Sequence, residues 1–184
     1  MAHAPILGSV RTASLSGYTD SAAAATTLAS GGKTVNGRIG RDLGSNDLIT
    51  LLDVAKARGM STGVVTTDAL TGATPASFMA HADNRYQTQE LADQIAFEPP
   101  DVLLGGGAGE LSGRIDRVAY QVVEDRDSLL AAVDDGRSLV GLFSANTFPF
   151  VSDGYTIEPT LAEMTDAAMT RLQTNPEGFV LVVE

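Results

Sequence analysis

Short apolar segments alternate with longer segments of helical periodicity along this chain of 184 residues. The apolar segments predict strands, because they are rich in branched apolar residues and lack the alternation of a strand with one wet face: 62–67, 102–104, 139–143 and 179–183. Helical spacing covers 21–30, 48–58, 75–81, 89–97, 127–133 and 159–173. This order predicts an α/β fold, a three-layer sandwich with a mostly parallel central sheet flanked by helices.

The composition fits one hydrophobic core of ordinary size, since 43% of the residues are hydrophobic. The loop-rich stretches 105–120 and 144–158 do not mark a domain boundary, so we expect residues 1–184 to belong to a single domain. The chain has no cysteine, which excludes disulfides and thiolate metal sites.

The charge is strongly acidic, with a formal net charge of −11 and only two lysines, Lys33 and Lys56. Such a balance argues against nucleic acid or an anionic membrane as a partner. It suits either a protein that works in high salt, where self-repulsion is screened, or an ordinary acidic protein. We find no apolar run typical of a transmembrane helix, and the start of the chain lacks the pattern of an export signal.

Residues 19–31, TDSAAAATTLASG, predict a helix that begins at Ser21 and ends before Gly31. A helix N-terminus offers unpaired N–H groups and a positive dipole end, which favour an anion. Two interpretations follow. Thr19, Asp20 or Ser21 is a plain N-cap, or the Ser21 hydroxyl is placed to attack a phosphoryl group.

Further segments resemble one family in the same order and spacing, from residue 5 to the last residue. They are PILGSVRT (5–12), TDSAAAATTLASGGKTVNGRIGRD (19–42), STGVVTTDALTGATPASFMAHADNR (61–85), DVLLGGG (101–107), SLVGLF (138–143), PTLAEMTDAA (159–168) and NPEGFVLVVE (175–184). Together they resemble the alkaline phosphatases, and 5–12 is similar to the strand that leads towards the family's nucleophile helix.

The resemblance implies hydrolysis of a phosphate monoester through a phosphoserine on Ser21, with two zinc ions and one magnesium ion in the complete enzyme. Ser21 would also be a zinc ligand. Asp20 matches the aspartate that helps to hold an arginine, and Arg85 matches that arginine, which grips the phosphate. Thr74 and Glu184 match ligands of the magnesium site.

Two departures from the family pattern limit what the resemblance implies. Gly72 stands where members commonly carry an acidic residue or histidine bordering the magnesium site, so water or another group must complete that shell. The chain is also similar to the middle of an alkaline phosphatase: a strand with a metal-bridging aspartate is expected before Met1, and most zinc ligands after Glu184. We expect His81 to be a packed residue on a helix and His3 to have no role. Because these are the only histidines, the chain alone cannot assemble two zinc sites and should be inactive.

Two alternatives remain open at this stage. One is a non-catalytic module that binds phosphate or a divalent cation through Ser21, Arg85, Thr74 and Glu184. The other is a related metal-dependent phosphodiesterase or sulfatase. By family analogy alone, the complete enzyme would form homodimers and reside in the periplasm or outside the cell.

Overall fold

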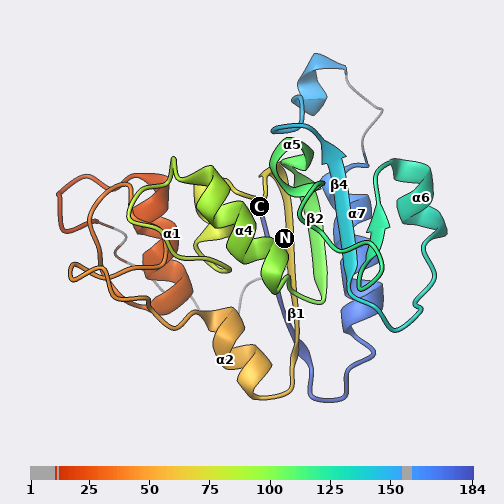
Figure 1. Cartoon of the computed structure of the whole chain (residues 1–184), viewed down its shortest axis with the longest axis horizontal. Helices are drawn as coiled ribbons and strands as arrows, with labels where there is room; N and C mark the ends of the chain where they lie inside the picture. Colours follow the sequence, from red (N-terminus) through yellow and green to blue (C-terminus); the bar gives the residue numbers. More distant parts are fainter. Residues whose placement is uncertain (1–10, 12, 155–158) are drawn as a thin grey trace, which may run out of the picture.

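The computed structural model describes residues 11, 13–154 and 159–184, which form a five-stranded sheet between two layers of helices (Figure 1). The segment PILGSVRT (5–12), expected to contain a strand, lies outside the described residues except for Arg11. The strands are β1 Ser61–Ala69, β2 Val102–Gly106, β3 Gln121–Val123, β4 Leu139–Ser144 and β5 Phe179–Val183. They lie in the order β3-β4-β2-β1-β5 and all four pairings are parallel, which confirms the predicted fold class.

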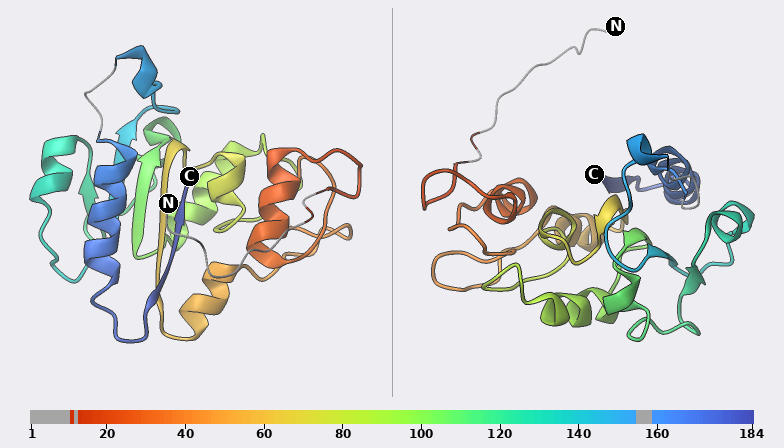
Figure 2. Two further views of the ribbon diagram at one scale, coloured as in Figure 1. Left: turned by 180° about the vertical axis from the view of Figure 1, so that it is seen from behind. Right: turned by 90° about the horizontal axis from the view of Figure 1, so that it is seen from above.

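Successive residues of the central strands face two different cores. Val64, Leu103 and Val140 belong to the core under α1, α3 and α4. The residues beside them in sequence, such as Val65 and Leu104, belong to the core under α6 and α7. Figure 1 shows α4 in front of the sheet, and Figure 2 shows α7 covering the opposite face. Both faces are therefore dry, which explains why the strands have no polar alternation.

The α-helices are α1 Ser21–Ser30, α2 Leu51–Ala57, α3 Ala73–Ala76, α4 Thr88–Phe97, α5 Ala108–Leu111, α6 Arg126–Ala131 and α7 Leu161–Leu172. The bounds of α1 are those predicted, and Gly31 ends it in the left-handed conformation with φ 73°. The predicted helix 48–58 begins later, at Leu51, because Thr50 and Asp53 form a capping box at its start.

The predicted helix 75–81 is wrong in extent. α3 starts at Ala73 and ends at Ala76, and the chain then forms an antiparallel bridge between Ile39 and Ala82. His81 therefore does not lie on a helix, contrary to the expectation. Two short elements in the loop-rich stretches were not predicted, α5 and a 3-10 turn over Val151–Asp153.

The strand β3 was also missed by the sequence interpretation. Its three residues are too few for a periodic signal, and they become a strand only by pairing with β4, where Gln121 lies beside Leu139. At the other edge of the sheet, the side chains of β5 are mostly half-buried. Within the ranges that the structure describes, no helix has the length and apolar character needed to span a membrane.

The carboxyl ends of β1, β2, β4 and β5 lie at the same end of the sheet, because all pairings are parallel. This is the upper end in Figure 1, where the C-terminus is marked. Open α/β sheets bind their ligands beyond this end of the strands. Asp68 near the end of β1 and Glu184 after β5 carry carboxylates there.

Candidate active site

The N-terminus of α1 carries the predicted nucleophile. Asp20 is the N-cap: its Oδ1 accepts a hydrogen bond from the backbone N–H of Ala23 at 3.0 Å. Of the three residues considered for this role, the structure selects Asp20. Ser21 is then the first residue of the helix, and its side chain is exposed to solvent.

Arg85 reaches this helix end from a segment 64 residues further along the chain. Its Nη1 donates a hydrogen bond to Ser21 Oγ at 2.6 Å and lies 3.6 Å from Asp20 Oδ2. The guanidinium also lies over the ring of Tyr86, with Cζ 5.9 Å from the ring centroid. The Arg85 side chain is 30% exposed, so it is anchored on one side and open to a ligand on the other. The fold thus brings Asp20, Ser21 and Arg85 together.

Gly37 joins the two halves of this cluster. Its N–H donates to Asp20 Oδ2 at 3.0 Å, and its carbonyl accepts from the backbone N–H of Arg85 at 2.7 Å. Gly37 has φ 86°, a conformation that side chains other than glycine's rarely adopt. The sequence interpretation did not single out Gly37, because its role depends on two segments distant in sequence.

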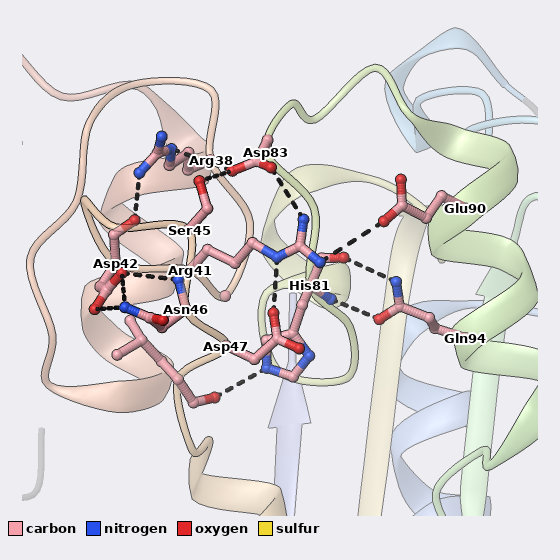
Figure 3. Close-up of polar contacts among 12 residues, drawn as sticks. Arg38, Arg41, Asp42, Ser45, Asn46, Asp47, His81, Asp83, Glu90 and Gln94 are labelled. Carbon is pink, nitrogen blue, oxygen red and sulfur yellow. Dashed lines mark hydrogen bonds and ion pairs between the residues drawn. The ribbon is translucent and has the colours of Figure 1, made fainter.

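An ion-pair network, which we call the clamp, fixes the segment that carries Arg85 (Figure 3). The clamp consists of Arg38, Arg41, Ser45, Asp47 and Asp83. Asp83 Oδ1 accepts from Ser45 Oγ at 2.7 Å, and Asp83 Oδ2 accepts from Arg41 Nη1 at 3.2 Å. Arg41 Nε also donates to Asp47 Oδ1 at 2.7 Å, and Arg38 Nε lies 3.5 Å from Asp83.

The pairing of Asp83 with Arg41 in the clamp favours the charged form of both residues. The hydrogen bond from Ser45, followed by the nearby charges of Arg41 and Arg38, lowers the pKa of Asp83 below its ordinary value. The hydrogen bond with Asp47 raises the pKa of Arg41 further. Asp83 lies two residues before Arg85, so the clamp fixes the approach of Arg85 to α1. No local sequence signal indicated it.

His81 is a packed residue near the segment that carries Arg85, and its polar groups contact Leu48 and Gln94 (Figure 3). Its Nε2 lies 2.9 Å from the carbonyl oxygen of Leu48. Its backbone N–H and carbonyl both bond to the side-chain amide of Gln94, at 2.9 and 2.8 Å. These contacts tie loop 37–49 and α4 to the strand-like segment around residue 82.

A second group of residues, which we call the oxygen cluster, comes from three elements: Asp68 near the end of β1, Thr74 in α3 and Glu184 after β5. Glu184 is not frayed: its N–H donates to Val65 O at 2.9 Å, and its Oε2 accepts from Thr66 Oγ1 at 2.9 Å. Thr74 lies inside the first turn of α3, whose N-cap is Gly72, so Thr74 is not an N-cap. The helices α3 and α1 pack together, which joins the two clusters.

The two implied metals differ in how they fit these residues. Across residues 11, 13–154 and 159–184, no three histidine, aspartate or glutamate side chains gather closely enough to hold a metal ion. The described residues therefore do not provide the zinc sites. Magnesium fits better, because it binds hard oxygen ligands and usually keeps several waters, so a hydroxyl and one or two carboxylates suffice.

A family model described as alkaline phosphatase matches residues 1–184. The chain belongs to the alkaline phosphatase family. It is 36% identical over 179 residues to alkaline phosphatase 3 of Bacillus subtilis, covering 90% of this chain and 38% of that protein. The resemblance seen in the sequence is thereby confirmed.

Solved alkaline phosphatases share the fold. The cold-active enzyme from Shewanella sp. superimposes with a TM-score of 0.87 and 38% identity over 94% of this chain and 44% of that one. A variant of the enzyme from the Antarctic bacterium TAB5, solved with Mg bound in its M3 site, gives a TM-score of 0.84 and 26% identity over 94% of this chain and 52% of that one. The chain spans about half or less of these alkaline phosphatases.

Proposed function

We propose that the protein carrying this chain is a phosphomonoester hydrolase with Ser21 as its nucleophile. The observation that carries the proposal is the 2.6 Å hydrogen bond from Arg85 to Ser21 Oγ at the N-terminus of a ten-residue helix. A nucleophile, a planar cation and a helix dipole converge there, which is the arrangement that receives a phosphate group. Membership of the family agrees with this chemistry.

In the proposed reaction, Ser21 Oγ attacks phosphorus and the bond to the ester oxygen breaks. The alcohol leaves, a phosphoserine remains on Ser21, and water then hydrolyses it to release phosphate. Arg85 binds two nonbridging oxygens of the phosphate with its guanidinium, while Asp20 and Gly37 hold Arg85 and the start of α1 in register. Zinc held at Ser21, as the resemblance implies, would supply positive charge that favours the serine alkoxide.

We assign Thr74 and Glu184 to hold a magnesium ion, which when bound supplies a hydrated dication beside the phosphate site. The oxygen chemistry of the two side chains and the Mg-bound TAB5 variant support this assignment. We also propose that residues 1–184 are part of one domain, since both hydrophobic cores share the same sheet. The proposed substrate is a phosphate monoester.

A non-catalytic phosphate-binding module is the second candidate. It is favoured by one observation: the described residues contain no group of three acidic or histidine side chains that could hold a metal ion. In that case Arg85 and the N-terminus of α1 would bind phosphate without a reaction.

The two candidates differ in whether phosphate becomes covalently bound. The full protein is mixed with an aryl phosphate, quenched in acid within one turnover, digested and analysed by mass spectrometry. We expect a phosphate adduct on the peptide that carries Ser21, and none in Ser21→Ala. An adduct on another residue, or undiminished turnover by Ser21→Ala, contradicts the proposal; phosphate binding without adduct or turnover supports the module.

A further inference from the structure

The carboxylate of Asp68 lies where a side chain on residue 72 would begin. A Cβ atom built on Gly72 would be 2.5 Å from Asp68 Oδ2 and 2.7 Å from the carbonyl oxygen of Ala69. Both distances are shorter than the contacts of real Cβ atoms. The carbonyl oxygen of Ala69 and the carboxylate of Asp68 together favour glycine at residue 72, and the Asp68 carboxylate lies in the space that the glycine leaves.

One oxygen of this carboxylate is held firmly and the other is not. Oδ1 accepts hydrogen bonds from Thr147 Oγ1 at 2.6 Å and from the N–H of Ala69 at 2.8 Å. Oδ2 accepts no hydrogen bond from the residues that the structure describes. Asp68 is half-buried and its Oδ2 is not among the buried atoms that lack a partner, so this oxygen is open to solvent and to a cation.

The free oxygen of Asp68 belongs to the same end of the sheet as Glu184 and Thr74. The hydroxyl of Thr66 accepts from the backbone N–H of Asp68 at 2.9 Å and donates to Glu184 Oε2 at 2.9 Å. Gly72, beside Oδ2, is the N-cap of the helix in which Thr74 is the second residue. Asp68 is thus linked to both assigned magnesium residues by one hydroxyl and one helix start.

The charge balance of this region calls for a cation. Of the lysine, arginine and histidine side chains that the structure describes, none lies within 4.0 Å of the carboxylate of Asp68 or Glu184. Asp68 is half-buried and Glu184 is exposed, so both carboxylates are open to a cation from solvent. A divalent cation neutralises both, and an all-oxygen donor set favours Mg²⁺ over softer metals.

We propose that Asp68 supplies the carboxylate of the magnesium site that the side chain of residue 72 does not. Asp68 and Gly72 form a matched pair: the carboxylate comes from the end of β1, and the start of α3 has no side chain in its way. This inference rests on the proposed function, because it uses the assignment of Thr74 and Glu184 to magnesium.

The test measures Mg²⁺ binding, without any need for turnover. The full protein is stripped with a chelator and titrated with Mg²⁺ by calorimetry, and the Mg²⁺-dependent rise in Tm is recorded in parallel. Asp68→Asn keeps an Oδ1 acceptor for Thr147 and Ala69 but loses the charge. We expect its Kd for Mg²⁺ to rise about 10- to 100-fold, as for other groups that support a metal site.

A second variant and a control complete the design. Gly72→Ala places a methyl group against Asp68 Oδ2 and the carbonyl oxygen of Ala69. It should weaken Mg²⁺ binding more while Asp68 is present than in the Asp68→Asn background, where only the contact with the Ala69 carbonyl still matters to the site. Asp116→Asn removes an exposed carboxylate that caps a loop elsewhere, and its Kd should be unchanged. If the losses of Mg²⁺ affinity in Asp68→Asn and Gly72→Ala simply add in the double variant, the two residues act independently and the matched pair is contradicted.

The outcomes separate this inference from the proposed function. An unchanged Kd in Asp68→Asn, with a weakened Kd in Glu184→Gln, overturns the role of Asp68 and leaves the magnesium site in place. An unchanged Kd in both Glu184→Gln and Thr74→Val overturns the magnesium site and the inference together. The phosphoserine on Ser21 is tested separately by the quench experiment.

Discussion

The Ser21 cluster, formed by Asp20, Ser21, Gly37 and Arg85, differs from the oxygen cluster in how its charges are balanced. In the Ser21 cluster, Arg85 lies against Asp20, and the clamp pairs Arg38 and Arg41 with Asp83 and Asp47. In the oxygen cluster, Asp68 and Glu184 accept hydrogen bonds only from hydroxyl and backbone groups among the described residues. One cluster is neutralised by its own side chains, and the other is left negative.

This difference indicates what each cluster binds. Paired charges hold Arg85 in one orientation before a ligand arrives, which lowers the entropy cost of binding a phosphate. The carboxylates of Asp68 and Glu184 have no basic partner among the described residues and are open to solvent, so they are available to the cation that we propose.

Residues 1–184 alone should show no turnover of an aryl phosphate above background, even with added zinc and magnesium. The reason is that the described residues provide no zinc site, so Ser21 has no activating group. Phosphate should still bind weakly, and less so in Arg85→Ala. Zinc-dependent turnover that disappears in Ser21→Ala would contradict this prediction.

Arg85→Ala in the full protein should lower kcat/KM by about 10²- to 10³-fold, because a preorganised cation on the transferring phosphate is lost. Mg²⁺ affinity should change little, since Arg85 belongs to the other cluster. Glu184→Gln should weaken Mg²⁺ binding and have the smaller effect on kcat/KM. Steady-state kinetics and Mg²⁺ calorimetry on both variants measure the two effects, and Arg117→Ala, which removes an exposed arginine paired with Glu124, is the control. Equal losses in both assays for both variants would mean that the clusters do not act separately.

Asp83→Ala should raise KM about fivefold with a smaller change in kcat, because the clamp orients Arg85 without touching the substrate. Asp83→Glu should restore part of the loss. Asp135→Asn removes another exposed carboxylate paired with an arginine and should leave KM unchanged. An unchanged KM in Asp83→Ala would show that the bonds through Gly37 suffice to place Arg85.

Salt should stabilise the protein as a whole. Self-repulsion at a net charge of −11 is screened by ions, so Tm should rise by roughly 5 °C between about 0.1 M and about 2 M KCl. Thermal unfolding followed by circular dichroism measures it. A Tm independent of salt would mean that local pairing, as in the clamp, already balances the acidic surface.

The smallest effect concerns Glu163, which lies in the first turn of α7 and belongs to neither cluster. Its hydrogen bonds with Arg126, and then with the backbone of Thr160, lower its pKa from 4.5 to about 2. Because the folded pKa is depressed, this pairing stabilises the fold above the ordinary pKa, and the contribution is lost as the pH falls from 4.5 towards about 2.

Glu163→Gln should remove this part of the acid sensitivity without affecting phosphate or Mg²⁺ binding. Urea unfolding of both proteins at pH values of about 6 and about 3 measures the difference. The variant should be less stable than the parent near neutral pH and should lose less stability on acidification. A parallel loss in both proteins would contradict the assignment.

Local signals in the sequence determined much of the fold and the start of α1 at Asp20 and Ser21, whereas Arg85 was singled out only through the resemblance to the family. The alanine-rich run with an acidic residue before it and Gly31 after it set the bounds of α1, because propensity and capping act within a few residues. The apolar segments predicted the parallel sheet, because strands that are buried on both faces lack polar alternation. Extents went wrong where tertiary contacts competed, as when the bridge between Ile39 and Ala82 ended α3 early.

Only the tertiary structure decided the connections between distant segments. The clamp joins Arg41 to Asp83 across 42 residues, and Gly37 links Asp20 to Arg85 through backbone groups that any sequence possesses. The sequence showed that Gly72 lacks a side chain, but not that the carboxylate of Asp68 occupies the space. Periodicity and propensity describe neighbours along the chain, whereas shared space and ion pairing depend on where the fold places residues that are far apart in it.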